Sequence, residues 1–246
     1  MIRTLLVVLV VFTYVFLVGP YCILHALITR RSAILYSAGR VGCRLGLSLA
    51  GIRLDVRGRD DLPPGPSLFL ANHQSYCDPP ALFATIPRNV RLILKKELRK
   101  LPLLGLIMEM GGFVFIDRKD RVQSVIGMKQ AVRELQQGNS FLIYPEGTRT
   151  RTGELGPFKK GPFIMAIESG TPIVPISVKG SYEIMPPHRF TVKPGTVVIT
   201  FHPPIATNSL QLADRERLTE RVRETIASAL EEDTPVHENA PAERIS

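Results

Sequence analysis

A histidine and an aspartate separated by four residues are the side chains of this chain best suited to proton transfer. His73 follows the apolar run 67–71, which predicts a short buried strand, and Asp78 precedes Pro79-Pro80, where a helix can begin. In α/β proteins, ligands bind at such strand ends. An imidazole takes up a proton near neutral pH, and a carboxylate on its other nitrogen fixes its tautomer. The pair therefore indicates a general base and an orienting partner.

Each member of the pair also has a purely structural interpretation. Asp78 before proline is a favourable helix N-cap, and His73 could be a hydrogen-bonded histidine at a strand end. Because short patterns match by chance, the pair alone does not establish a catalytic site. Cys77, in the same stretch, is better explained as a small buried side chain than as a nucleophile. Ser75 lacks the Gly-x-Ser-x-Gly surroundings of a serine hydrolase.

Basic residues cluster just after several predicted strands, at Lys95-Lys96, Arg118-Lys119, Arg149 with Arg151, and Lys159-Lys160. A single cluster is most simply a solvated basic surface. Strand ends of one polarity gather along one sheet edge, however, so that four clusters together predict an anion site. Within one of them, Gly147 permits close backbone approach, Thr148 offers a hydroxyl, and Arg149 offers a planar guanidinium for phosphate.

Metal-binding and disulfide-stabilised classes have weak support. A metal site of His73, Asp78 and Glu146 would need one histidine and two carboxylates from scattered segments. The three cysteines are too few and too scattered for a disulfide framework or a cysteine zinc site. They indicate a reducing compartment.

The formal net charge of +9 suggests anionic partners: phosphate-bearing ligands, an acidic membrane surface or nucleic acid. Aromatic residues make up only 7% of the chain and tryptophan is absent, so stacking platforms for single-stranded nucleic acid are scarce.

Residues 4–29 are uncharged and long enough to cross a bilayer as a helix. Gly19-Pro20 predicts a kink or break, which leaves either a kinked span or a segment that only dips into the membrane. If the run spans, the arginines that follow it place the next domain in the cytoplasm. Residues 33–51 predict an amphipathic helix at the headgroup level, with an ordinary core helix as the alternative.

After residue 51, short apolar runs alternate with helical segments. We expect strands at 52–56, 67–71, 90–94, 113–116, 141–144, 173–178 and 196–201, and helices at 80–86, 102–110, 120–137, 161–169 and 210–230. The helix 120–137 has Asp120 as its cap and an apolar face of Val122, Val125, Ile126, Val132 and Leu135. The alternation predicts an α/β fold with a mixed, largely parallel sheet flanked by helices.

Four ordered blocks of the sequence resemble those of the glycerolipid acyltransferases. They lie at 72–78 (Asn-His-Gln-Ser-x-x-Asp), 115–118 (Phe-Ile-Asp-Arg), 144–150 (Tyr-Pro-Glu-Gly-Thr-Arg-Thr) and 173–177 (Ile-Val-Pro-Ile-Ser). Within that family, the chain looks like the 1-acyl-sn-glycerol-3-phosphate acyltransferases. The resemblance covers about residues 67–180, and the presence of four blocks in the family's order makes it specific.

The resemblance implies a glycerol-3-phosphate acyltransferase-like fold and transfer of a fatty acyl group from acyl-CoA or acyl carrier protein. The acceptor would be the sn-2 hydroxyl of 1-acyl-sn-glycerol-3-phosphate, giving phosphatidic acid. His73 would be the general base and Asp78 its orienting residue. The implied substrate-binding residues are Lys95, Lys96, Arg118, Glu146, Gly147, Thr148 and Arg149. No metal or organic cofactor is expected, because a thioester is already activated and the acceptor needs only a base.

On this interpretation, residues 1–50 are membrane-anchoring helices, 51–231 the catalytic domain and 232–246 a disordered tail. The partners would be a phospholipid surface, lysophosphatidate and the acyl thioester, without nucleic acid, at the inner face of the cytoplasmic membrane. Three alternatives remain: an acyltransferase for another lyso-lipid such as lyso-ornithine lipid, a membrane-bound metal hydrolase, and a non-enzymatic basic protein that binds anionic lipid or nucleic acid.

Overall fold

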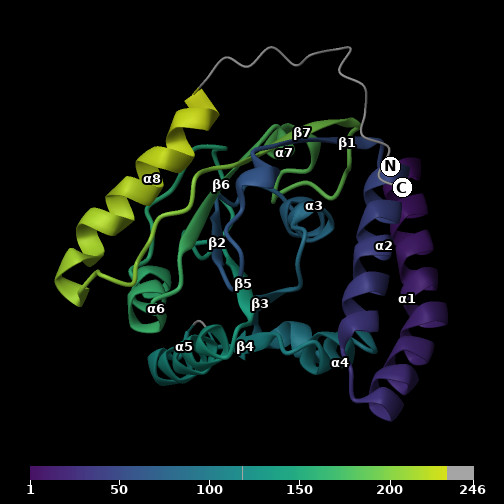
Figure 1. Cartoon of the computed structure of the whole chain (residues 1–246). Coiled ribbons are helices and arrows are strands. Elements are labelled where there is room, and N and C mark those ends of the chain that lie inside the picture. The colour runs from purple at the N-terminus through teal and green to yellow at the C-terminus, as the bar shows by residue number, and fades with distance from the viewer. Residues whose placement is uncertain (118, 232–246) are drawn as a thin grey trace.

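One mixed sheet forms the centre of the computed structural model, which describes residues 1–117 and 119–231 (Figure 1). Its strand order is β1-β7-β6-β2-β5-β3-β4. The strands are β1 (Ile52–Arg57), β2 (Leu68–Ala71), β3 (Val90–Lys95), β4 (Val114–Ile116), β5 (Ser140–Ile143), β6 (Ile173–Lys179) and β7 (Gly195–Phe201). The run from β6 to β4 is parallel, whereas β7 is antiparallel to β6 and parallel to β1. The predicted mixed, largely parallel sheet is confirmed.

Helices cover both faces of the sheet (Figure 1). On one face, α2 (Ala33–Leu49), α3 (Asp78–Thr85) and α7 (Ser181–Ile184) enclose one apolar cluster with the strands. On the other, α5 (Arg121–Gln136), α6 (Gly161–Ser169) and α8 (Arg215–Glu231) enclose a second cluster. Between these elements lie α4 (Leu104–Met110) and the 3₁₀ turns Arg59–Asp61, Lys96–Lys100 and Leu212–Asp214.

The central strand β2 shows why both faces must be covered. All four of its residues are buried. Leu68 and Leu70 belong to the cluster under α5, α6 and α8, whereas Phe69 and Ala71 belong to the cluster under α2, α3 and α7. Since β2, β5, β3 and β4 are parallel, their carboxyl ends share one edge of the sheet. The segments that follow these strands are therefore brought together.

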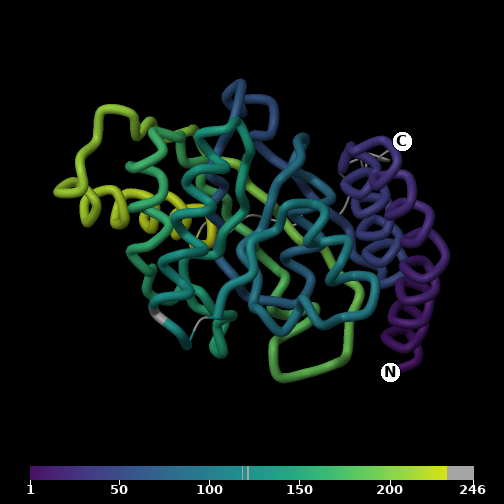
Figure 2. Tube along the Cα trace, turned by 90° about the horizontal axis from the view of Figure 1, so that it is seen from below, coloured from purple at the N-terminus to yellow at the C-terminus, as the bar shows by residue number. Residues whose placement is uncertain are grey.

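An antiparallel hairpin of α1 (Ile2–Thr29) and α2 lies along one side of the α/β domain (Figures 1 and 2). The packing is close because glycines of α2 face side chains of α1: the Gly42 position contacts Tyr14, and the Gly46 position contacts Val11. By length and composition α1 could cross a membrane, and most of it is uncovered by protein. Its exposed apolar side chains include Leu5, Leu9, Phe12, Leu17, Leu24 and Leu27.

The sequence predicted a kink or a break at Gly19-Pro20, and the break is wrong, because α1 continues as one helix through both residues. A proline forfeits a helix hydrogen bond, but packing on either side holds this segment. A Cβ on Gly19 would lie 3.2 Å from Ile107 Cδ1 of α4, and Cys22 and Ala26 are buried against Leu35. The helix predicted at 33–51 is present as α2, between α1 and α3.

Helix α5 begins at the predicted cap: the Asp120 side chain accepts hydrogen bonds from the amides of Val122 and Gln123. The prediction of its apolar face is only partly right. Val122, Val125 and Ile126 are exposed, while Ala131 and Leu135 are buried in the core. A Cβ on Gly127 would lie 2.4 Å from Ile116 Cγ2, so this small residue allows α5 to approach β4. The side of the helix that carries residues 127, 131 and 135 consequently faces the sheet.

Gly180, between β6 and α7, allows a close approach of the chain to β7 that a larger residue would prevent. Its φ is 84°, and a Cβ there would lie 2.6 Å from the Thr196 carbonyl oxygen. Gly65 has a similar φ of 85°, but a Cβ on it would meet nothing within 4 Å. Both alanine variants incur a left-handed backbone cost of about 1–2 kcal/mol, and only Gly180→Ala also clashes. We expect Gly180→Ala to lower the Tm clearly more than Gly65→Ala in thermal unfolding. Equal losses would contradict this packing.

Candidate active site

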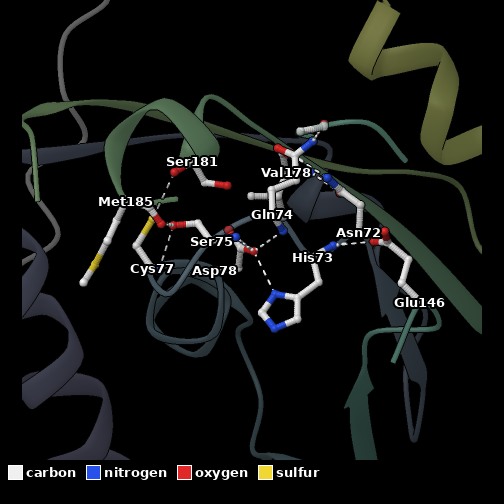
Figure 3. Close-up of polar contacts among 11 residues, drawn as sticks. Asn72, His73, Gln74, Ser75, Cys77, Asp78, Glu146, Val178, Ser181 and Met185 are labelled. Atoms are coloured by element: carbon white, nitrogen blue, oxygen red, sulfur yellow. Dashed lines mark hydrogen bonds and ion pairs between the residues drawn. The ribbon is translucent and has the colours of Figure 1, made fainter. Parts of the chain in front are cut away.

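The imidazole of His73 lies just beyond β2 and is held by Asp78 in the first turn of α3 (Figure 3). His73 Nδ1 is 2.9 Å from Asp78 Oδ2, and the aspartate side chain is fully buried. The His73 ring is 15% exposed, and its Nε2 faces away from Asp78 without a hydrogen-bond partner among the described residues. A carboxylate on Nδ1 favours the tautomer with a free lone pair on Nε2. This nitrogen is therefore arranged to accept a proton.

Asp78 also shapes the backbone around the histidine. Its Oδ2 accepts hydrogen bonds from the Gln74 and Ser75 amides, both at 2.7 Å, in addition to His73 Nδ1. The aspartate thus bonds to residues that precede it, and Cys77 occupies the N-cap position of α3. Asp78 Oδ1 has no partner within the described part of the chain. Three donors on one oxygen compensate for its burial and fold residues 73–78 around it.

The loop after β5 holds the His73 backbone from the other side. Glu146 Oε1 accepts from the His73 amide at 2.7 Å, and Oε2 accepts from Gly156 at 2.9 Å. The Thr150 amide donates to the His73 carbonyl oxygen at 2.9 Å. Burial raises the pKa of Glu146, and the two amide donors offset only part of that rise. The loops at 73–78 and 145–156 consequently behave as one hydrogen-bonded unit.

His73, Asp78 and Glu146, the candidate metal ligands, lie close together, but their donor atoms do not face one common position. Both carboxylate oxygens of Glu146 face backbone amides, and Asp78 directs its bonded oxygen at N–H groups. Among residues 1–117 and 119–231, no three histidine, cysteine, aspartate or glutamate side chains form a group that could hold a metal ion. This geometry gives the metal-hydrolase alternative no ligand set.

Two residues within the sequence blocks 72–78 and 144–150, to which no site role was predicted, also position His73. Asn72 is fully buried. Its side-chain amide donates through Nδ2 to Val178 O at 2.8 Å and accepts through Oδ1 from Val178 N at 2.7 Å (Figure 3). The Tyr144 ring stacks on the imidazole, with centroids 4.0 Å apart and planes 17° apart. Burial raises the pKa of Tyr144 well above its ordinary value, so that the phenol stays neutral. Only their positions in the sequence could have indicated this role: Asn72 directly follows β2 and Tyr144 directly follows β5, and these two strands are neighbours in the sheet.

Cys77 faces the protein interior. Its sulfur is 3.1 Å from Ser75 Oγ, which in turn donates to Met185 O at 2.7 Å (Figure 3). Burial, reinforced by the adjacent Asp78 carboxylate, raises the pKa of this thiol to about 12. The thiol therefore stays protonated near neutral pH, which suits a packing role better than nucleophilic attack.

Several of the predicted basic residues already have carboxylate partners. The Lys95 ammonium lies 3.6 Å from Glu97, and Lys96 pairs with Asp117 at the end of β4. Lys160 pairs with Glu216 of α8. Arg118 lies outside the described residues. These three lysines are exposed, and each lies within ion-pair distance of a carboxylate.

Arg149 differs from those residues. Its guanidinium carbon lies 3.6 Å from the centre of the Tyr76 ring, and it makes no ion pair with a described carboxylate. Gly147, with φ of 75°, lies beneath the Lys159 side chain: a Cβ there would be 2.7 Å from Lys159 Nζ. Thr148 is exposed in the same loop. Arg149 therefore belongs to the loop that holds the His73 backbone, and the Lys159 side chain packs over Gly147 of the same loop.

Comparison with known proteins gives consistent results. The acyltransferase family model matches residues 53–179, just over half of the chain. The chain is 33% identical to the chloroplastic 1-acyl-sn-glycerol-3-phosphate acyltransferase BAT2 of Brassica napus, over 72% of this chain and 51% of the relative. It is 30% identical to the Saccharomyces cerevisiae 1-acyl-sn-glycerol-3-phosphate acyltransferase, over 75% and 62%. The aligned part spans about half to two thirds of these relatives.

A solved structure shares the fold. The 1-acyl-sn-glycerophosphate acyltransferase PlsC from Thermotoga maritima superposes with a TM-score of 0.78 and 24% sequence identity, covering 92% of this chain and 95% of that one. From the family match, together with the relatives above, we conclude that this chain belongs to the acyltransferase family.

Proposed function

We propose that this chain transfers a fatty acyl group from an acyl thioester to the sn-2 hydroxyl of 1-acyl-sn-glycerol-3-phosphate, giving phosphatidic acid. The observation that carries the proposal is the 2.9 Å contact between His73 Nδ1 and Asp78 Oδ2, which leaves Nε2 open. Arg149, without a carboxylate partner among the described residues, supplies positive charge for a phosphate. The names of the B. napus and S. cerevisiae relatives support this acceptor.

The reaction needs one base. His73 Nε2 takes the acceptor's hydroxyl proton as the oxygen attacks the thioester carbonyl carbon. Asp78 keeps its hydrogen bond to Nδ1 and stabilises the imidazolium. Collapse of the tetrahedral adduct breaks the carbon–sulfur bond, and the departing thiolate takes the proton from Nε2. The scheme restores the base, uses acyl-CoA or acyl carrier protein as co-substrate, and requires no metal or organic cofactor.

In this scheme the basic loop holds the acceptor. Arg149 binds its phosphate, with Gly147, Thr148 and the neighbouring Lys159 beside it, and so brings the adjacent hydroxyl to His73. Lys95 and Lys96, at the end of β3, add positive charge from that strand end, and Arg118 keeps the phosphate-binding role that the sequence predicts for it. We assign Glu146 a different task, because its two oxygens are occupied by the amides of His73 and Gly156. It positions the base.

We also propose that the α1–α2 hairpin, residues 1–50, embeds the catalytic domain, residues 51–231, in the inner face of the cytoplasmic membrane. One side of α1 is apolar and exposed. The other side stays against the protein along the helix: Thr4 Oγ1 accepts from Val192 N at 3.0 Å, and Cys22 and Ala26 pack on Leu35. A perpendicular span would draw the attached domain into the bilayer. The hairpin therefore enters one leaflet, and the +9 charge favours anionic lipid.

An acceptor panel tests the proposed reaction. The purified protein, supplied with acyl-CoA or acyl carrier protein donors, is expected to convert lysophosphatidate to phosphatidic acid. Lyso-ornithine lipid and 1-monoacylglycerol, which lack the phosphate, should be poorer acceptors because they cannot engage Arg149 in the same way. Product analysis by mass spectrometry measures all three. If lysophosphatidate is inert while another lyso-lipid is acylated, the proposed acceptor is wrong.

Asp78→Asn tests the role of the carboxylate without dismantling its loop. An amide oxygen in place of Oδ2 can keep the three N–H donors, and the amide nitrogen then replaces Oδ1, which has no described partner. The negative charge that supports the imidazolium is lost. We expect kcat to fall about 10²- to 10⁴-fold, in line with loss of general base catalysis, while the Tm stays near that of the wild type.

Asp78→Ala is the matched control, since it removes the charge and the three hydrogen bonds together. It should lose activity and also lower the Tm. If Asp78→Asn retained wild-type kcat, the carboxylate would have only a structural role.

A further inference from the structure

Tyr76 connects the candidate phosphate-binding group to the candidate base. It lies inside the 73–78 loop, between His73 and Asp78, and the Arg149 guanidinium carbon sits 3.6 Å from its ring centre. A cation this close to an aromatic face is attracted by the ring quadrupole. The guanidinium of one loop is thereby held by a ring of the other.

Contact with a ring leaves the arginine available to an anion. Lys95, Lys96 and Lys160 have their charge met by carboxylates, whereas Arg149 has no such partner in the part of the chain that the structure describes. Unlike a carboxylate, the aromatic face carries no formal negative charge and does not accept hydrogen bonds from the guanidinium N–H groups. A guanidinium resting on it keeps its N–H fork for a bidentate anion such as phosphate.

Both ends of this contact are fixed relative to His73. On one side, Ser75 N donates to Asp78 Oδ2 and Ser75 Oγ donates to Met185 O, which set the backbone next to Tyr76. On the other, the amide of Thr150, the residue after Arg149, donates to the His73 carbonyl oxygen. The ring of Phe190 lies beside Tyr76, with centroids 5.5 Å apart. The ring of Tyr76 therefore determines where the guanidinium lies relative to the base.

We propose that Tyr76 is a positioning residue that sets acceptor specificity. By holding Arg149 at a fixed place beside the 73–78 loop, it places the acceptor's phosphate so that the neighbouring hydroxyl reaches His73 Nε2. The inference rests on the proposed function and deepens it: preference for an acceptor with a phosphate next to its hydroxyl depends on an aromatic ring inside the His-x4-Asp stretch. The ring acts through Arg149 and does not touch the reacting atoms.

Steady-state kinetics of the full-length protein with lysophosphatidate and 1-monoacylglycerol test the proposal. Tyr76→Leu removes the aromatic face, and we expect the KM for lysophosphatidate to rise about 3- to 30-fold, the range of a cation–π contact. The KM for the acyl donor and the pH profile of kcat should move little, and the preference for lysophosphatidate over 1-monoacylglycerol should fall. Tyr76→Phe keeps the aromatic ring, and its KM for lysophosphatidate should stay at the wild-type value.

The Arg149→Ala background supplies the control. Because the guanidinium is absent there, adding Tyr76→Leu should raise the KM no further. Thermal unfolding checks each variant, and Tyr76→Met, which keeps a long side chain without an aromatic face, replaces Tyr76→Leu if the latter does not fold. An unchanged lysophosphatidate KM in Tyr76→Leu, or a rise in Tyr76→Phe as large as in Tyr76→Leu, overturns the role of the ring. Wild-type protein inactive on lysophosphatidate would instead overturn the proposed function, and this inference with it.

Discussion

Asp78 Oδ2 accepts hydrogen bonds from the His73 ring and from the amides of Gln74 and Ser75. A fully buried carboxylate is costly unless such donors replace its hydration, and here all three come from the residues it must organise. The same oxygen therefore sets the backbone of the loop and the orientation of the imidazole. Loss of this acceptor would release both at once, so base geometry and loop geometry are a single constraint.

The surrounding structure reinforces that constraint from independent directions. Asn72 joins the start of the loop to β6, Glu146 holds the His73 amide, and Tyr144 covers one face of the imidazole. These residues come from segments far apart in the chain. They meet because β2 lies between β5 and β6 in a parallel arrangement, which places the ends of all three strands at one edge. The fold thus supplies a rigid base beside a loop whose Arg149 has no carboxylate partner among the described residues.

Much of this arrangement could be predicted from the sequence, because it depends on local patterns. Short apolar runs separated by helical periods predicted the mixed sheet, and Asp120 correctly predicted the start of α5. The His-x4-Asp spacing predicted the His73–Asp78 contact, which is a matter of residues within one loop. In α5, packing against the sheet overrode the local apolar pattern. Gly127 faces β4, whereas Val122 and Ile126 of the predicted apolar face are exposed.

The remaining features depend on contacts between distant segments. Nothing near Glu146 in the sequence indicates that both of its oxygens bind backbone amides, one of them that of His73. The stacking of Tyr144 on His73 and of Arg149 on Tyr76 likewise requires knowledge of which strands are neighbours. The pairing of Lys96 with Asp117 also depends on β3 and β4 being neighbours in the sheet, whereas the Lys95–Glu97 contact is local.

The central claim is that Asp78 holds His73 with the proton on Nδ1 and a bare Nε2 facing the acceptor. Nitrogen-15 NMR of histidine-labelled protein, with the His73 signals assigned from the spectrum of a His73→Gln variant, measures this tautomer directly. For the neutral imidazole, the account predicts a protonated Nδ1 and an unprotonated Nε2. A neutral His73 that carries its proton on Nε2 would contradict it, since that nitrogen could not then act as the base.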